Sequence, residues 1–414
     1  MVDHAHADKQ RLTTPQQFQP AGERLITLDA LRGFAILGIL LPNMFAFAWP
    51  TAAMTDPSVI GGSQWNVFAH DLNSTAFLGK FMFNFAMLFG AGVVLFDRKT
   101  TPTDRKPKLS DGWALWCRRC AALLVIGIVH AYLFWFGDIL FWYAVCGLSL
   151  VWWARKLSAQ TQIVGGLALF TLGATMMVGL TGGLAWAVGE GHIPASQMNP
   201  DPARELAGYL GSWFDAFKIR AITTLAMHLM FLPLMLPTIL GIMILGMGLT
   251  KSGVLTGERS TRFHATLCIM MLVLGTATTT AGYVLVKNTE FSVPSGAVWQ
   301  SMAQFLGAPL AIGYSQLIVL ACRAKSLRKP VQALANVGRM ALTNYLSQTL
   351  ICTTLFYGYG FGFFASIPFP HLFGVIVAVW VFNFALSALW LRYFRFGPFE
   401  WLWRQMTYLG LPKA

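Results

Sequence analysis

An acid, a base and an amide lie in one otherwise apolar stretch of the chain. The stretch 28–43, LDALRGFAILGILLPN, contains Asp29, Arg32 and Asn43. Asp29 and Arg32 are three residues apart and can pair on one helix face. Arg32 and Asn43 are about three turns apart, so they share one stripe about 16 Å long. Such a stripe suits the wall of a polar cavity. Alternatively, Arg32 extends to lipid phosphate and Asn43 bonds a neighbouring helix.

A histidine followed by an acid is the second candidate for chemistry. His130 precedes Asp138, with an apolar turn between them. Histidine is the side chain most readily used for proton transfer near neutral pH, and Asp138 could orient its ring. We expect His130 to be a general base about 7 Å below an interface marked by Trp135. The alternative is a packed, hydrogen-bonded histidine. His70, in a predicted outer loop, is the reserve candidate.

Other polar side chains inside apolar segments are candidates for substrate contacts. Ionisable residues within membrane helices usually face a protein interior or a wet cavity. Each also has a simpler explanation, since lysine can extend to the membrane surface and amides can join neighbouring helices. The catalytic candidates are His130, Asp138 and Asn43. The substrate-binding candidates are Asp29, Arg32, Lys80, Arg339, Asn344 and Gln348, and His228 and Tyr143 are weaker.

Membrane helices must position these side chains. Hydrophobic residues make up 56% of the 414 residues, charged residues 11%, and the mean hydropathy is +0.56. Soluble domains carry about 25% charged residues, so this chain lacks the polar surface of a soluble protein. The predicted fold is an all-α polytopic membrane protein with about ten transmembrane helices in one bundle. The expected spans are 27–49, 75–96, 117–136, 139–154, 162–189, 222–249, 264–286, 297–321, 341–357 and 372–391.

The distribution of basic residues predicts the orientation of this bundle. With a cytoplasmic N-terminus, 24 of the 30 Lys and Arg residues fall on the inner side, four fall outside and two lie within spans. This asymmetry follows the positive-inside rule, so both termini are expected in the cytoplasm. The net charge of +13 is explained by a basic rim facing anionic membrane lipid, without a nucleic-acid partner.

The chain divides into a short tail and two membrane halves. Residues 1–24 are polar and show no signal-peptide core, residues 25–220 form the N-terminal half, and residues 221–414 form the C-terminal half. Pro233 and Pro237 predict a kink. Walker, GxSxG and HExxH motifs are absent, and the Cys117–Cys120 pair has no second Cys or His pair near it, so we expect no metal site and no ATP loop.

Five stretches carry a family resemblance that extends from about residue 24 to residue 408. They are RLITLDALRGFAILGILLPN, GKFMFNFAMLFGAG, IGIVHAYLFWFGDILFWYAVCGL, GRMALTNYLSQTLICTTLFY and WLRYFRFGPFEWLWRQMTY. Together they resemble the YeiB-like family of bacterial inner-membrane proteins. The C-terminal half of that family is known as domain of unknown function 418.

The N-terminal half also resembles, more loosely, transmembrane acyltransferases of the heparan glucosaminide N-acetyltransferase type. That resemblance implies that cytoplasmic acyl-CoA, such as acetyl-CoA, enters past Arg32, which Asp29 positions. Asn43 would bond the acyl carbonyl or the acceptor, an envelope sugar, lipid or small molecule. Asn43 stands where related enzymes use histidine, so the base must be His130 or His70.

The sequence leaves two other function classes open. A transporter or exporter would also use polar stripes and helix-breaking prolines. A structural or signalling membrane subunit would use the same polar residues only to join helices. The oligomeric state is open and compatible with a dimer.

Overall fold

The computed structural model describes residues 21–54, 59, 61, 63–100, 112–194, 201–287 and 293–409, and every regular element in these ranges is a helix. Seven segments are long and apolar enough to cross a membrane. The expectation of an all-α, multi-pass membrane protein is therefore confirmed. These segments lie in α1 (Ala21–Ala48), α2 (Gln64–Leu72) together with α3 (Lys80–Thr100), α4 (Trp113–Leu133), α7 (Ala159–Gly189), α9 (Trp213–Lys251), α10 (Thr261–Lys287) and α15 (Phe369–Tyr393).

Three of the ten predicted spans correspond to shorter or interrupted helices. The segment 139–154 is divided into α5 (Leu140–Leu148) and α6 (Val151–Ala154). The segment 297–321 is divided at Gly307, and Pro309 just beyond that break has no N–H to continue the hydrogen-bond ladder. The two parts of the segment 297–321 are α11 (Val293–Leu306) and α12 (Ala308–Arg323). The segment 341–357 forms the shorter helix α14 (Ala341–Phe356), and α13 (Arg328–Arg339) precedes it.

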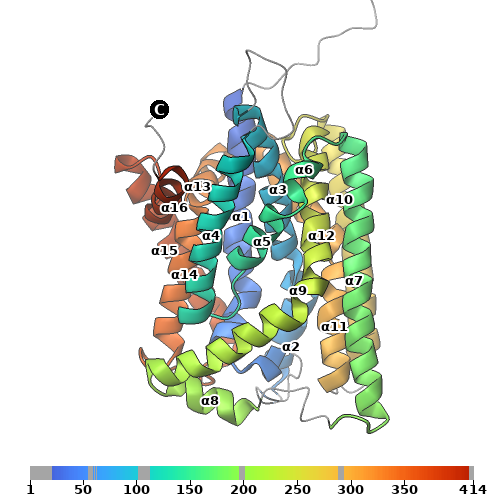
Figure 1. The fold of residues 1–414 in the computed structure, drawn as a ribbon, viewed down its shortest axis with the longest axis vertical. Coiled ribbons are helices and arrows are strands. Elements are labelled where there is room, and N and C mark those ends of the chain that lie inside the picture. The colour runs from blue at the N-terminus through green and yellow to red at the C-terminus, as the bar shows by residue number, and fades with distance from the viewer. Residues whose placement is uncertain are drawn as a thin grey trace, which may run out of the picture.

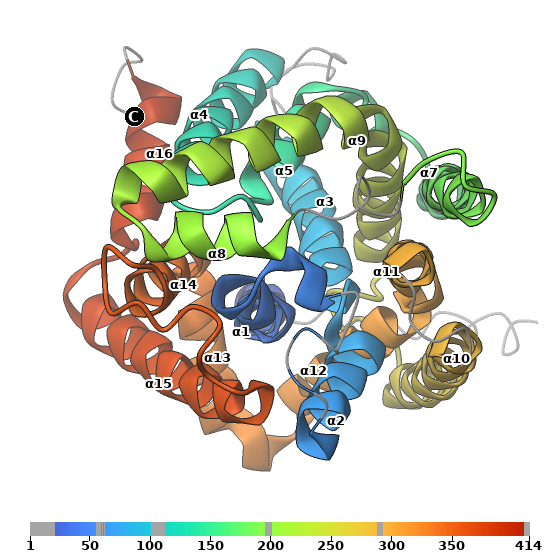
Figure 2. The same ribbon diagram turned by 90° about the horizontal axis from the view of Figure 1, so that it is seen from below.

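Helix α1 is the central helix of the bundle (Figure 2). Of its most apolar window, 83% is buried inside the protein, compared with 28% for α7, α10 and α15. Its backbone touches that of α13, because a methyl group at Gly33 would lie 2.0 Å from the Leu334 carbonyl oxygen. Most side chains of α1 therefore face protein rather than lipid.

The two ends of the bundle are formed by different helices. The first turns of α1 and the C-terminal helix α16 (Pro398–Tyr408) lie at one end, and α2 and α8 (Pro202–Leu210) lie at the other (Figure 1). We call the first the basic end, because Arg32, Arg119 and Arg339 lie there, and the second the α8 end.

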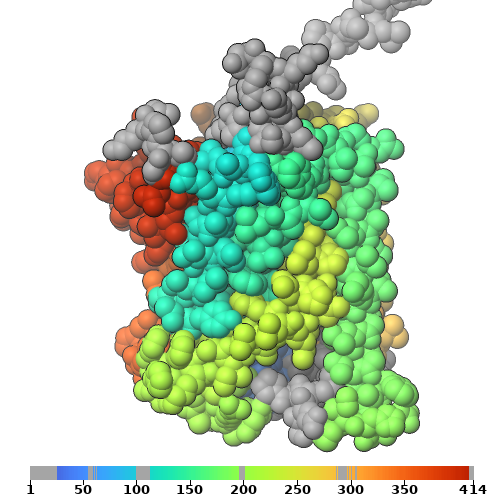
Figure 3. All heavy atoms as spheres, viewed as in Figure 1, coloured from blue at the N-terminus to red at the C-terminus, as the bar shows by residue number. Residues whose placement is uncertain are grey.

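Helix α9 bends and covers part of the α8 end. Its ribbon changes direction midway (Figures 1 and 2), and Pro233 and Pro237 lie inside it, so the predicted kink is present. Burial changes at the same place: nearly every residue of 238–250 is buried, whereas 213–237 bury one stripe, Ala216, Arg220, Thr224 and His228. Atoms of α8 and of the first half of α9 cover the lower front of the molecule (Figure 3).

One buried and one half-buried acid attach the short helices to the bundle ends. Glu205 of α8 accepts hydrogen bonds from the Thr51 N–H and hydroxyl, at 2.7 and 2.6 Å. Glu400 of α16 accepts from the Thr343 N–H and hydroxyl, at 3.0 and 2.5 Å, in the first turn of α14. Burial raises the pKa of both carboxyl groups, and the hydrogen bonds from threonine oppose that shift.

Candidate functional site

The structure brings His130 into a buried chain of three side chains. Its Nδ1 lies 2.7 Å from Asp138 Oδ2, and its Nε2 lies 2.9 Å from the Thr349 hydroxyl of α14. All three side chains are buried. The predicted contact between His130 and Asp138 is therefore present, and Thr349 is an additional partner.

The carboxylate determines which ring nitrogen of His130 holds the proton. An ionised carboxylate can only accept hydrogen bonds, so the Nδ1–H donates to Asp138. In the neutral ring, Nε2 then accepts the hydrogen bond that the Thr349 hydroxyl donates. This order of hydroxyl, imidazole and carboxylate is the arrangement that activates oxygen nucleophiles in many hydrolases.

Contacts with backbone groups hold Asp138 and the end of α4 that carries His130. Asp138 also accepts a hydrogen bond from the Phe141 N–H at 2.7 Å, in the first turn of α5. Arg220 of α9 donates to the Tyr132 and Phe134 carbonyl oxygens, at 2.9 and 3.0 Å, at the end of α4. The guanidinium therefore satisfies carbonyl groups that a helix end leaves unpaired.

Trp135 is buried inside the protein. Its side chain is only 2% exposed and stacks on Phe47 of α1, with ring centroids 4.1 Å apart. The depth of His130 below the outer interface, which was inferred from Trp135, stays a prediction. Trp135 is enclosed because α8 and the first half of α9 lie over this end of the bundle (Figure 1), which the order of apolar blocks does not indicate.

The predicted ion pair at the basic end is present. Arg32 Nη1 lies 2.9 Å from Asp29 Oδ1, with both side chains partly exposed. Arg339 is close enough to attract the same carboxylate. Arg119 lies over the Trp403 ring at 3.7 Å and close enough to Arg32 for their charges to repel. This end therefore carries more positive than negative charge.

The stripe between Arg32 and Asn43 packs within the main core. Ile36, Ile39 and Leu40, which lie along it, are buried there. The side chain of Asn43 is half-buried and makes no hydrogen bond to the residues that the structure covers. The expected role of this stripe as a cavity wall stays a prediction.

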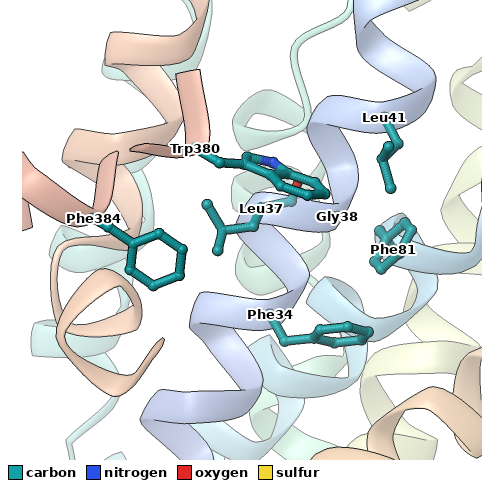
Figure 4. Close-up of a pocket in the computed structure, with 7 residues that line it drawn as sticks. All are labelled: Phe34, Leu37, Gly38, Leu41, Phe81, Trp380 and Phe384. Carbon is teal, nitrogen blue, oxygen red and sulfur yellow. The ribbon is translucent and has the colours of Figure 1, made fainter. Parts of the chain in front are cut away.

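A cavity lies against the other face of α1 (Figure 4). Its volume is about 290 Å³, and the Trp380 indole N–H is satisfied because it donates to the Leu37 carbonyl oxygen at 2.9 Å. At 100° per residue, its α1 residues lie opposite Arg32 and Asn43. The lining residues are Phe34, Leu37, Gly38, Leu41, Phe81, Trp380 and Phe384. An apolar lining of this kind suits a hydrocarbon chain rather than a polar substrate.

Asn344 and Gln348 join helices. The Asn344 amide donates to the Val337 carbonyl of α13 and to Ser387 of α15, at 3.0 and 2.9 Å. The Gln348 amide donates to the Ile36 carbonyl of α1 and to an α15 asparagine, at 3.1 and 2.9 Å. These contacts fit the alternative interpretation, in which the amides join neighbouring helices. A role of Asn344 and Gln348 in substrate binding stays a prediction.

The remaining candidates do not contact the His130 chain directly. His70 lies 3.2 Å from the Tyr283 hydroxyl of α10. His228 stacks on Phe141, with ring centroids 3.7 Å apart. The Tyr143 hydroxyl donates to the Met82 carbonyl at 3.0 Å. Lys80 is buried beside the junction of α11 and α12.

Sequence reasoning missed Thr349 and Arg220. Thr349 resembles any threonine of a membrane helix, which commonly bonds its own backbone. Arg220 was assigned to the predicted outer loop, although its four-residue spacing from Ala216 and Thr224 is a helical signal. In the part of the chain that the structure describes, no group of His, Cys, Asp and Glu could hold a metal ion.

Comparisons with known proteins identify relatives along almost the whole chain. Residues 249–410 match the family described as "Protein of unknown function (DUF418)". The chain is 35% identical to "Uncharacterized protein YeiB" of Escherichia coli (strain K12), over 93% of this chain and 96% of that protein. It is 31% identical to "Uncharacterized protein YxaH" of Bacillus subtilis (strain 168), over 94% and 95% of the two chains.

No solved structure matches the chain. The relatives cover both membrane halves, and the DUF418 match lies within the segment 221–414. The protein therefore belongs to the YeiB-like family with a DUF418 region.

Proposed function

We propose that this protein is an acyltransferase of the bacterial inner membrane, which passes an acyl group from cytoplasmic acyl-CoA to an envelope sugar, lipid or small molecule. The observation that carries the proposal is the buried chain from Thr349 through His130 to Asp138. The bacterial membrane agrees with the sources of the relatives.

The geometry supports a simple division of work among the three side chains. Acyl-CoA supplies an acyl group that is already activated as a thioester. His130 Nε2 takes the proton of the acceptor hydroxyl or amine as the new bond to the acyl carbon forms, and passes it to the departing thiolate. Asp138 keeps Nδ1 protonated and stabilises the positive ring. The Thr349 hydroxyl donates to Nε2 at 2.9 Å in the structure, so the acceptor has to displace it to reach the ring.

The basic end fits the phosphate groups of the donor. Arg32 and Arg119 lie together there, and guanidinium groups bind phosphate oxygens in a two-pronged geometry. Asp29 neutralises only part of this charge. In this proposal Arg32, Arg119 and Arg339 hold the donor, and Asn43 contacts the acyl or acceptor group further along α1.

Binding of coenzyme A tests the proposal. A charged hydrogen bond contributes about 1.5–3 kcal/mol, so Arg32→Ala and Arg119→Ala should each weaken binding by about 10–100-fold. Equilibrium binding of radiolabelled acetyl-CoA to the full chain in lipid nanodiscs gives the affinity. Arg328→Ala, on an exposed position of α13, is the matched control and should bind as the wild type.

Failure has a clear form in this experiment. Absence of binding by the wild-type protein, or equal affinity for all three variants, would exclude a donor site at the basic end.

The proposed orientation places both termini and the basic end in the cytoplasm. The ends of the described chain lie at the same end of the bundle (Figure 1), which agrees with that arrangement. Reporter fusions after residues 105 and 330 should therefore report the cytoplasm, and fusions near residue 205 the outer side. A cytoplasmic signal near 205 would contradict this topology.

A transporter is the second candidate. The observations that favour it are the proline bend in α9 and the break between α11 and α12, since interrupted helices are common in transporters. An experimental density map separates the two functions: coenzyme A extending from Arg32 toward His130 supports the enzyme, and a central solute supports the transporter.

A further inference from the structure

Lys80 is a buried amine without a hydrogen-bond partner among the residues that the structure describes. It is the first residue of α3 (Lys80–Thr100), its side chain is 1% exposed, and its Nζ makes no hydrogen bond to the residues that the structure describes. Eighteen residues separate it from Arg98 at the basic end, about 27 Å along a helix. Lys80 therefore lies toward the α8 end, deep inside the protein.

The alternative role of Lys80, extension to the membrane surface, does not fit this position. A lysine that extends to the surface leaves its amine in water or beside lipid phosphate, whereas here the amine itself is buried. A buried amine without hydrogen bonds costs free energy in either protonation state, and more when charged. The partner of such a group is an ordered water or a bound ligand.

A second unsatisfied donor lies one turn along the same helix face. Asn84 is 2% exposed, and its Oδ1 accepts a hydrogen bond from Ser315 of α12 at 2.8 Å. Its Nδ2 is buried without a partner among the described residues. Residues four apart on a helix lie on one side, so α3 presents two free donors toward α12.

The fold leaves room for the Lys80 side chain at the junction of α11 and α12. A methyl group at Gly307 would lie 2.5 Å from Lys80 Cε and 2.9 Å from Nζ. Only glycine therefore allows the amine to rest there. The junction also begins α12, where Pro309 interrupts the backbone ladder.

These contacts place the amine on a different side of α1 from the His130 chain. Lys80 and Asn84 face α11 and α12, whereas His130 faces α14. Helices α12 and α14 lie on different sides of α1 in Figures 1 and 2. A ligand of Lys80 is therefore separate from the reacting groups of the proposed acyl transfer.

We infer that Lys80 and Asn84 form a binding site for an oxyanion, meaning a carboxylate or phosphate group, which enters from the α8 end. An amine and an amide that both donate are best matched by an acceptor with negative charge, which also stabilises the protonated amine. The anionic group belongs either to a lipid headgroup or to a free small molecule. This site goes beyond the acyl-transfer proposal and does not depend on it.

Thermal unfolding of the full chain in nanodiscs tests the site. A ligand that binds only the folded state raises the unfolding temperature. We compare phosphate and acetate with chloride at equal ionic strength in discs of neutral lipid, and then add anionic phosphatidylglycerol. A shift with the soluble anions identifies a free ligand, and a shift only with phosphatidylglycerol identifies a lipid headgroup.

Two variants and one control connect the shift to this site. Lys80→Met should lose the anion-dependent shift, with at least tenfold weaker binding, and should be as stable as the wild type or more so without anions. Asn84→Asp supplies an internal counter-ion and should also lose the shift. Lys287→Met is the control: this lysine pairs with Asp71 and is partly exposed, so the shift should remain.

The inference would be overturned by either of two results. One is a wild-type protein whose unfolding temperature responds to neither phosphate nor acetate nor phosphatidylglycerol. The other is a folded Lys80→Met or Asn84→Asp variant whose unfolding temperature still rises with anions as it does in the wild type. The two variants are made and tested separately, so failure of one to fold leaves the other as the test.

Discussion

Replacing His130 with glutamine should lower the turnover of acyl transfer by about 10²–10⁴-fold, the usual contribution of general acid–base catalysis. Glutamine is similar in size and can still hydrogen-bond the Thr349 hydroxyl, but it cannot take up a proton at neutral pH. The measurement is transfer of radiolabelled acetyl from acetyl-CoA to an envelope fraction. Binding of acetyl-CoA should be unchanged. The proposed donor site is at the basic end, away from the contact between His130 and Thr349.

Neighbouring variants make this result specific. Asp138→Asn should lower turnover by a similar factor, because an amide whose oxygen accepts from the Phe141 N–H turns its NH2 group toward Nδ1 and moves the ring proton to Nε2. Thr349→Val removes the hydroxyl without changing the side-chain volume much, and this variant should change turnover. Thr349→Ser keeps the hydroxyl and should turn over as the wild type does. His228→Gln is the control, because that ring stacks on Phe141 and has no part in the proton path.

Two outcomes would show that His130 is not the base. Full turnover in His130→Gln with loss in His70→Gln would move the base to the Tyr283 side of the bundle. Full turnover in both variants would exclude acyl transfer by a histidine.

Replacing Arg220 with methionine should destabilise the protein by about 3–6 kcal/mol. Two hydrogen bonds from a charged group are lost, each worth about 1.5–3 kcal/mol, and the partly buried carbonyls of Tyr132 and Phe134 lose this donor. Unfolding in detergent, followed by intrinsic fluorescence, gives the change. Turnover should also fall, because Arg220 fixes the end of α4 that carries His130.

The controls for Arg220 follow from its geometry. Arg220→Lys should recover only part of the stability, because an ammonium group cannot reproduce the planar, two-directional contact. Lys218→Met, two residues away and exposed to solvent, should leave the unfolding temperature unchanged. Equal stability of Arg220→Met and the wild type would show that the α4 carbonyls are satisfied in another way.

The sequence by itself determined the class of the protein. Membrane helices are specified by local apolar content, because each must satisfy its own backbone within about 20 residues. The seven long segments, the all-helical architecture and the kink near Pro233 were therefore predictable. The Asp29–Arg32 pair was predictable for the same reason, since three residues along one helix fix its geometry.

Local apolar content did not predict where helices end or break. The break at Gly307 and the short α5 and α6 lie inside continuous apolar blocks. The backbone there can leave the helix because neighbouring side chains satisfy it: the Thr278 hydroxyl donates to the Leu306 carbonyl at 3.0 Å. That partner lies on another helix and gives no signal in the local pattern.

Only the tertiary structure decided which polar side chains meet. Thr349 is 219 residues from His130, and Arg220 is 88 residues from the Tyr132 carbonyl. Periodicity tells which side of a helix is polar, but the rotation of each helix about its axis and its neighbours in the bundle are set by packing of the whole set. Asn344 therefore had the same sequence signature as a substrate ligand, yet its amide joins α14 to α13 and α15.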